Sequence, residues 1–267
     1  MVRLEFAITL QYDVDAPGGD FIFALHAAQT AHQHLVHEAL AFNRPVQHNV
    51  YEDHCTHNRL LRLHAEPGPL SVRYDAIVDI DHHVAHPDQI RESAVADLPG
   101  SVLNYLHPSR YCPSDRLQRM ACANFGHLPK GYRRVEAIRD WVAARVCFRP
   151  GTSTQQTTAL DTLVECAGVC RDFAHLMIAL CRAVNLPARF VSGIDYGADP
   201  ALGPMAFHAY VEVYLDGHWY LFDPSKLAIP MGFVRLATGR DAADTSFATI
   251  YGPVRGQMPL VEMRALT

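Results

Sequence analysis

The stretch GVCRDFAHLMIALCRAVNLPARFVSG, residues 168–193, decides how the second half of the chain folds. Gly168 interrupts the pattern before it, and residues 170–185 then form a strongly apolar run, which predicts a buried helix. Asn185 is a typical residue at the end of a helix, and the proline two residues later cannot continue one. Residues 188–196 are predicted to form a strand. The stretch therefore predicts a helix that leads directly into a β-strand.

Further helices are predicted before this stretch, and further strands are predicted after it. Residues 114–125 and 135–146 have apolar side chains at i, i+3 and i+4, and residues 159–167 form a shorter helical segment. Residues 206–215 and 218–223 alternate as strands do, and the Asp-Gly pair between them is a strong hairpin signal. Helices followed by an antiparallel sheet indicate an α+β domain.

The first part of the chain is predicted to be rich in β-strands. The segments with alternating or β-branched residues are 4–14, 20–26, 35–42, 58–65 and 70–80. Strands with no helices between them indicate a small sandwich-like module. The polar, proline-bounded residues 85–100 indicate a linker. We therefore expect two domains, an all-β domain over residues 1–95 and an α+β domain over residues 96–267.

The composition excludes several classes of protein. With 267 residues, 49% of them hydrophobic and 19% charged, the chain can bury a core and is not globally disordered. It contains no run of eighteen apolar residues, so we expect no spanning helix and no membrane partner. The net charge of −5 is spread without a basic stripe, so we expect no nucleic-acid partner. Residues 1–15 lack the layout of a signal peptide, which favours a cytoplasmic location.

The cysteines and histidines show no metal-site signature. The odd number of cysteines, 7, argues for free thiols rather than a disulfide framework, and Cys166 and Cys170 have no second pair with which to form a zinc knuckle. Two histidine clusters lack the i, i+4 spacing with a glutamate that hydrolytic zinc sites use. These clusters are His32, His34 and His37, and His82, His83 and His86. We therefore expect no metal and no cofactor.

Cys170 is the candidate nucleophile. It lies in the first turn of the predicted helix, where unpaired N–H groups and the positive end of the helix dipole stabilise a thiolate. The same N–H groups can receive the oxyanion of an attacked carbonyl, and we assign that role to the amide of Cys170. By contrast, Cys181 lies within the apolar helix, where burial makes a thiol inert.

His208 and Asp223 are the candidate partners of this cysteine. In the strand before the Asp-Gly turn, His208 lies on the face opposite the apolar positions. A two-residue turn pairs position 212 with position 221 and so places Asp223 diagonal to His208 on the same face. A carboxylate there orients the imidazole and stabilises its charged form. The three residues thus meet the requirements of nucleophile, general base and orienting group.

The order cysteine, histidine, aspartate, on a helix and then a sheet, resembles the transglutaminase-like superfamily of papain-like thiol enzymes. The matching blocks are GVCRDFAHLMIALCRAVNLPARFVSG (168–193), FHAYVEVYLDGHWYLFDPS (207–225) and LATGRDAADTSFATIYG (236–252). The third block is similar to bacterial members that have an additional N-terminal β domain. The resemblance implies a papain/transglutaminase-like core, with Cys170, His208 and Asp223 as its catalytic residues.

The resemblance does not assign every role. Many papain-like enzymes use a glutamine at the oxyanion, but Gln155 and Gln156 lie in a polar loop whose spacing does not match. Trp141 and His175 are expected to pack, because Trp141 lies on a helix and His175 points away from Cys170 at 100° per residue.

The expected chemistry is acyl transfer at an amide bond of a peptide or protein substrate through a thioester on Cys170. With water as acceptor the enzyme is a cysteine protease or amidase, and we favour this hydrolysis. With an amine as acceptor it is a protein-glutamine transglutaminase, and the three residues do not separate the two. A different class, a catalytically silent binding scaffold, is disfavoured by the intact triad. The oligomeric state is left open.

Overall fold

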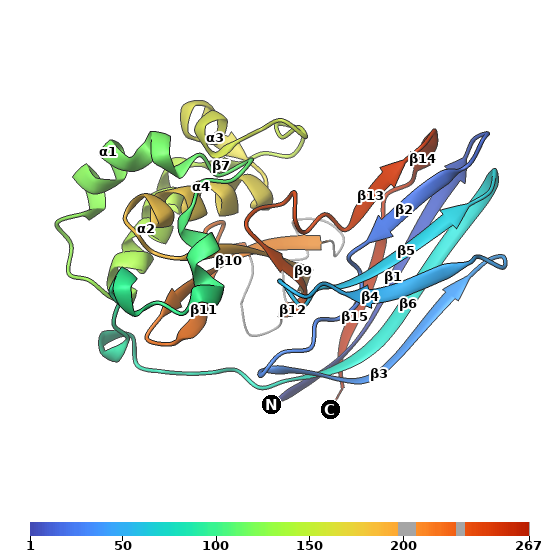
Figure 1. Ribbon diagram of the computed structural model, residues 1–267, viewed down its shortest axis with the longest axis horizontal. Helices are drawn as coiled ribbons and strands as arrows, with labels where there is room; N and C mark the ends of the chain where they lie inside the picture. The colour runs from blue at the N-terminus through green and yellow to red at the C-terminus, as the bar shows by residue number, and fades with distance from the viewer. Residues whose placement is uncertain (197–206, 228–232, 267) are drawn as a thin grey trace.

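The computed structural model describes residues 1–196, 207–227 and 233–266, and Figure 1 shows a β-sandwich beside a half that contains the helices. One sheet of the sandwich has the strand order β14-β1-β6-β3, with β15 also paired to β1, and the other has the order β13-β2-β5-β4. The first sheet consists of β1 (Val2–Val14), β3 (Gln33–Phe42), β6 (Gly68–Ile80), β14 (Val254–Gly256) and β15 (Leu260–Leu266). The second consists of β2 (Gly19–Phe23), β4 (His48–Glu52), β5 (Arg59–Ala65) and β13 (Ala248–Tyr251).

The alternation of apolar residues builds the core of the sandwich. Leu4, Phe6 and Ile8 on β1 are buried and pack with Phe21 and Phe23 from the facing sheet. The five predicted strands correspond to β1, β2, β3, β5 and β6. The strand β4 was not predicted, because all of its side chains are exposed and it has no apolar alternation.

The end of the chain returns to the sandwich. Strand β13 pairs with β2, while β14 and β15 pair with β1, all of them antiparallel. The N-terminal strands of the sandwich end at Ile80, ahead of the expected domain boundary at residue 95. Residues 248–266, assigned in sequence to the second domain, lie within its two sheets. Local alternation cannot show this, because it does not say which distant strand is the partner.

The half with the helices is built around α4 (Cys170–Ala183), in which every residue from Asp172 to Ala183 is buried. Helix α4 packs against the other helices and against a sheet of order β11-β10-β9-β12. These elements are α1 (Ser114–Phe125), α2 (Tyr132–Arg145), α3 (Ala159–Glu165), β9 (Ala188–Asp195), β10 (Phe207–Leu215), β11 (His218–Phe222) and β12 (Phe233–Gly239). The predicted α+β architecture is confirmed. Within the described ranges, no helix is long and apolar enough to cross a membrane.

The hairpin of β10 and β11 has the predicted register. Asp216 and Gly217 both have positive φ angles, 48° and 82°, as a type I′ turn requires. Glu212 therefore lies opposite Leu221. Position 206 of the predicted strand lies outside the described residues. Both faces of β10 are covered, since Tyr210 and Glu212 are as deeply buried as the apolar Val211 between them.

Side-chain amides join the sandwich to the outer edge of β12. Gln33 accepts from the N–H of Arg235 and donates to its carbonyl, both at 2.8 Å. Asn58 makes the same pair of bonds with Thr238, also at 2.8 Å. Each amide thus replaces a neighbouring strand for one residue of β12. The two halves also share apolar packing, because Val234 lies in the core of the sandwich.

Candidate active site

The start of α4 is fixed by a buried aspartate. The N–H of Val169 donates to Oδ2 of Asp172 at 2.9 Å, and the hydroxyl of Ser153 donates to Oδ1 at 2.9 Å. Gly168 allows this approach, because a Cβ at that position would lie 2.7 Å from Cβ of Asp172. Cys170 is the first residue of the helix and is half-buried. The thiol is therefore presented from a rigid turn at the positive end of the helix dipole.

The loop before α3 packs beside this turn. Nη2 of Arg171 donates to the hydroxyl of Ser153 at 3.0 Å and to the carbonyl of Thr154 at 2.5 Å. The guanidinium of Arg171 also lies 5.2 Å from the ring centre of Tyr111, whose hydroxyl donates to the carbonyl of Gln155 at 2.8 Å. One wall of the site is thus tied to the helix that presents Cys170.

His208 and Asp223 are brought together as the strand register predicts. Nε2 of His208 lies 3.5 Å from Oδ2 of Asp223, with 12% and 4% of the two side chains exposed. The other oxygen of Asp223 accepts from the N–H of Ser225 at 2.9 Å and from its hydroxyl at 2.6 Å. The carboxylate is therefore held by a local turn on one side and faces the imidazole with the other.

The charges in this site favour an imidazolium. Burial disfavours the charged form of His208, but the hydrogen bonds and charges of Asp223 and of a Cys170 thiolate outweigh burial and raise the pKa of His208 to about 10. Burial likewise opposes the charge of Asp223, yet its hydrogen bond and ion pair with His208 hold the pKa of Asp223 below its ordinary value. The electrostatic coupling thus links all three predicted residues.

A cavity of about 570 Å³ contains the reactive groups. Cys170 and His208 both line it. Around them it is bounded by Arg110, Tyr111, Gln155, Arg171, Phe190, Ser192, Phe207, Ala209, Ala242, Ala243 and the run from Thr245 to Ile250. Gln155 thus reaches the cavity, although its spacing in sequence did not match a papain-like glutamine. The volume is in the range of small-molecule and peptide subsites.

Sequence reasoning missed a second carboxyl group beside His208. Asp195 is 3% exposed, and neither of its oxygens has a hydrogen-bond partner among the residues that the structure describes. Burial raises its pKa to about 6. The nearby hydroxyl of Tyr210 is likewise unpartnered within the described ranges, and the ring of Tyr210 meets that of His208 edge-on at 4.5 Å. The only signal in the sequence was an aspartate at the end of an apolar strand.

Several residues have the structural roles expected of them. Nε2 of His175 accepts from the N–H of Ala242 at 3.1 Å, and burial lowers the pKa of His175 well below its ordinary value. Trp141 packs edge-on against Phe125 with ring centres 5.9 Å apart. Cys181 is fully buried, which raises the pKa of its thiol to about 12. These three side chains therefore have packing roles rather than catalytic ones.

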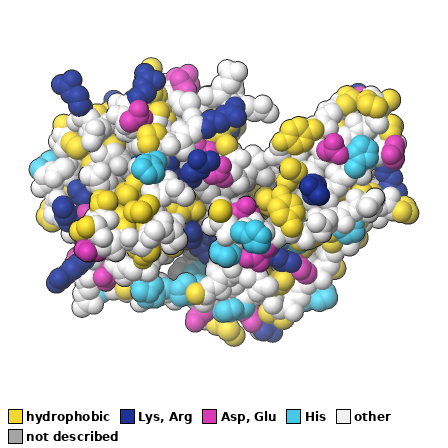
Figure 2. All heavy atoms as spheres, viewed as in Figure 1, with side chains coloured by type: hydrophobic (Ala, Val, Ile, Leu, Met, Phe, Trp, Pro, Cys, Tyr) yellow, Lys and Arg dark blue, Asp and Glu magenta, His cyan; other side chains and the backbone are white. Residues whose placement is uncertain are grey.

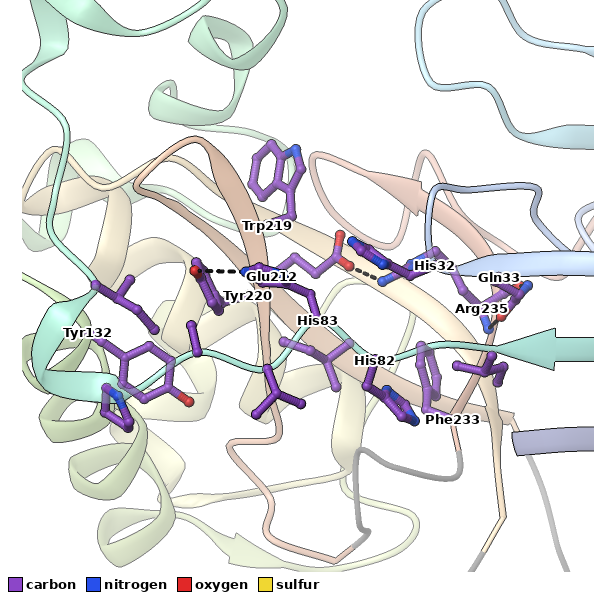
Figure 3. Close-up of a pocket in the computed structure, with 16 residues that line it drawn as sticks. His32, Gln33, His82, His83, Tyr132, Glu212, Trp219, Tyr220, Phe233 and Arg235 are labelled. Carbon is purple, nitrogen blue, oxygen red and sulfur yellow. Dashed lines mark hydrogen bonds and ion pairs between the residues drawn. The ribbon is translucent and has the colours of Figure 1, made fainter. Parts of the chain in front are cut away.

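A second cavity, of about 310 Å³, lies between the sandwich and the sheet of β9–β12. Figure 3 shows the carboxylate of Glu212 beside Arg235 there, and the hydroxyl of Tyr220 pointing at His83. The two histidine clusters meet at this place, since the ring of His83 lies 5.8 Å from that of His32. Over the described part of the chain, no three histidine, cysteine or acidic side chains are arranged to hold a metal ion.

Comparison with known proteins finds relatives of both halves. Residues 120–224 match the model of the transglutaminase-like superfamily, and residues 2–101 match that of the bacterial transglutaminase N-terminal domain. The chain is 38% identical to a solved structure named "a Putative Cysteine Protease from Cytophaga hutchinsonii". That similarity covers 100% of this chain and 91% of the other, with a TM-score of 0.93.

Two mycobacterial proteins are also similar. An uncharacterized protein of Mycobacterium leprae is 28% identical over 163 residues, which cover 59% of this chain and 57% of the relative. One of Mycobacterium tuberculosis is 32% identical over 180 residues, which cover 60% of this chain and 54% of the relative. The chain thus spans about half the length of these curated relatives. With both halves matched and the fold shared over its full length, the chain belongs to the transglutaminase-like superfamily.

Proposed function

We propose that Cys170, His208 and Asp223 form a catalytic triad that hydrolyses an amide bond of a peptide or protein. The observation that supports this most directly is that Cys170 and His208 line one cavity while Asp223 stands against the imidazole. A nucleophile, a base and an orienting carboxylate in this order are what acyl transfer by a thiol requires.

The proposed reaction has two halves. The thiolate of Cys170 attacks the carbonyl carbon, and the oxyanion is stabilised by N–H groups at the start of α4. His208 gives its proton to the departing amine as the C–N bond breaks, which leaves a thioester on Cys170. His208 then takes a proton from water as the water attacks the thioester. The C–S bond then breaks, which releases the acid and leaves the Cys170 thiolate beside the protonated His208, as at the start.

Water is proposed as the acceptor rather than an amine. The structure that is 38% identical over the whole chain is named "a Putative Cysteine Protease", which favours hydrolysis. Transglutamination remains the alternative outcome of the assay, since the same thioester can be attacked by an amine. A silent scaffold is the third outcome, and the coupled charges of His208 and Asp223 weigh against it.

The first experiment is a map of thiol reactivity. Limiting iodoacetamide is applied from pH 5 to 9 to the wild type and to His208→Ala, and alkylation of each cysteine is measured by mass spectrometry. We expect Cys170 to react faster than the exposed Cys55 and Cys122, and to slow when His208 is lost. Equal rates at these three thiols, unaffected by the substitution, would favour the scaffold.

The acceptor is then identified with a peptide substrate in the presence and absence of a primary amine. Incorporation of ¹⁸O from labelled water into the released acid indicates hydrolysis, and incorporation of the amine indicates transglutamination. Cys170→Ala is the control, since it removes the nucleophile. We expect ¹⁸O in the acid product to dominate, and a predominance of amine adducts would replace hydrolysis by the alternative.

A further inference from the structure

Strand β13 is the last strand of its sheet, and among the described residues it pairs with β2 alone. The N–H of Ala24 donates to the carbonyl of Phe247 at 3.1 Å, so Phe247 directs its backbone groups toward β2. In an antiparallel ladder successive residues direct these groups to opposite sides. The backbone groups of Thr249 therefore also face β2, whereas the N–H and C=O groups of Ala248 and Ile250 face away from the sheet.

The side chains of Ala248 and Ile250 do not occupy this free edge. Both are partly buried and pack against the core of the sandwich. A ligand at this edge can therefore form hydrogen bonds with the backbone N–H and C=O groups of the two residues. Two residues spaced i, i+2 along an edge strand provide the pattern to which an extended peptide binds.

The edge opens into the cavity that contains the reactive groups. Ala248, Thr249 and Ile250 line the same cavity as Cys170 and His208. In Figure 1, β13 lies on the side of the sandwich that faces the helices, and Figure 2 shows the surface notched between these two halves. A peptide on this edge would thus extend along the sandwich with one end at the thiol.

The edges of β12 and β13 differ in whether side chains bind their backbone groups. The edge of β12 is closed by the amide side chains of Gln33 and Asn58. For β13, no comparable side-chain bond to Ala248 or Ile250 is found among the described residues. An unpaired edge invites another strand, and proteins usually cover or blunt it. The β13 edge borders the cavity that contains Cys170, so it is placed to bind a ligand there.

We propose that a substrate peptide binds as an additional strand on β13, through backbone hydrogen bonds to Ala248 and Ile250. The proposal rests on the function proposed above and adds the substrate class: extended peptides of at least three residues, recognised largely through their backbone. It also gives the sandwich a role, because the β13 edge forms one side of the substrate site.

The test uses acetyl-oligoalanine p-nitrophenyl esters with one to five alanines, because backbone recognition does not depend on the side chains. Acylation of Cys170 is followed by nitrophenol release, with Cys170→Ala as the background. We expect kcat/KM to rise by about tenfold or more as the chain becomes long enough to pair with both residues, since each hydrogen bond contributes roughly three- to tenfold.

A scan with N-methylated alanines then locates the pairing. A methyl group on an amide that faces β13 should remove the gain and raise KM, while the same group one residue along should have little effect. This period of two is the signature of a strand. An N-methyl effect without this period, or no gain with length, overturns the proposal.

Substitutions in β13 test the same backbone contact by changing the protein instead of the peptide. Ala248→Pro removes the N–H that faces the peptide, and Thr249→Ala is the matched control that leaves the backbone intact. We expect Ala248→Pro to abolish the rise of kcat/KM with ester length, whereas Thr249→Ala should retain that rise. If Ala248→Pro does not fold, the N-methyl scan decides alone. If Cys170 is acylated by no ester, the proposed function fails, and this inference fails with it; normal acylation without length dependence overturns this inference only.

Discussion

Two ion pairs on one face of β10 show how the fold separates structure from chemistry. His208 and Glu212 lie four residues apart on this strand and are both largely buried. Glu212 is bound by two arginines, with Nε of Arg189 donating at 2.7 Å to one oxygen and Arg235 donating to the other. His208 stands 3.5 Å from Asp223, a longer contact than either arginine makes with Glu212.

The two pairs differ in how completely their charged groups are hydrogen-bonded. Both oxygens of Glu212 are bound by guanidinium groups, which outweigh burial and hold the pKa of Glu212 below its ordinary value, so this carboxylate stays charged. The imidazole of His208 is loosely held, lies beside a cavity and shares that cavity with a thiol. Catalytic hydrogen bonds are often long in the free enzyme and shorten when substrate binds. The loose pair is therefore the one suited to catalysis.

The largest effect is expected for His208→Ala. The substitution removes the group that moves protons between Cys170 and the leaving amine, so kcat/KM for a peptide substrate should fall at least about 10³-fold. The loss of stability should be smaller than for Glu212, because Asp223 keeps two hydrogen bonds from Ser225. Peptide hydrolysis and urea unfolding measure the two effects. Activity within tenfold of the wild type would remove His208 from the mechanism.

Glu212→Gln should have the opposite profile. It leaves Arg189 and Arg235 buried without a carboxylate, which should lower the free energy of unfolding by about 3–5 kcal/mol. The folded fraction should still alkylate Cys170 at the wild-type rate. Glu262→Gln is the matched control, since Glu262 is exposed and its pair with Arg73 contributes about 1 kcal/mol or less. Equal unfolding midpoints for the two variants would contradict the structural role of Glu212.

Asp223→Asn tests the looser pair without removing the imidazole. We expect kcat/KM to fall, though by less than for His208→Ala, because the orientation and charge of His208 are no longer supported. The pKa of His208 should fall from about 10 toward its ordinary value, since the carboxylate that raises it is gone. Titration of the His208 signal by NMR measures this. A pKa that stays near 10 in the variant would show that Asp223 does not hold the charge.

The smallest effect is expected in the dependence of stability on pH. The pKa of His208 is raised above its ordinary value of 6.5, so its contribution to stability is full below pH 6.5 and is lost as pH rises through about 10. The pKa of Asp223 is lowered, so its contribution is present above pH 3.8 and is lost as pH falls below that value. The excess stability of the wild type over Asp223→Asn should therefore shrink at both extremes. An excess that is constant from about pH 3 to about pH 10 would contradict the coupling.

Much of the site was predictable because its determinants are local. The apolar run after Gly168 predicts α4 and the place of Cys170 at its start. The Asp-Gly turn fixes the register of β10 and β11, and that register brings Asp223 to His208. Even the support of Asp223 by Ser225 is a contact two residues along the chain. Short-range patterns are sufficient for such features, because turn geometry and strand alternation act within a few residues.

The tertiary structure alone decided how the distant parts meet. Nothing in the alternation of residues 248–266 indicated that these strands would complete the N-terminal sandwich, or that β13 would border the cavity of Cys170. The burial of Asp195 beside His208 and the two arginines around Glu212 likewise depend on which strands are neighbours. Local sequence determines the faces and ends of single elements, whereas pairing across the chain depends on the packing of the whole core.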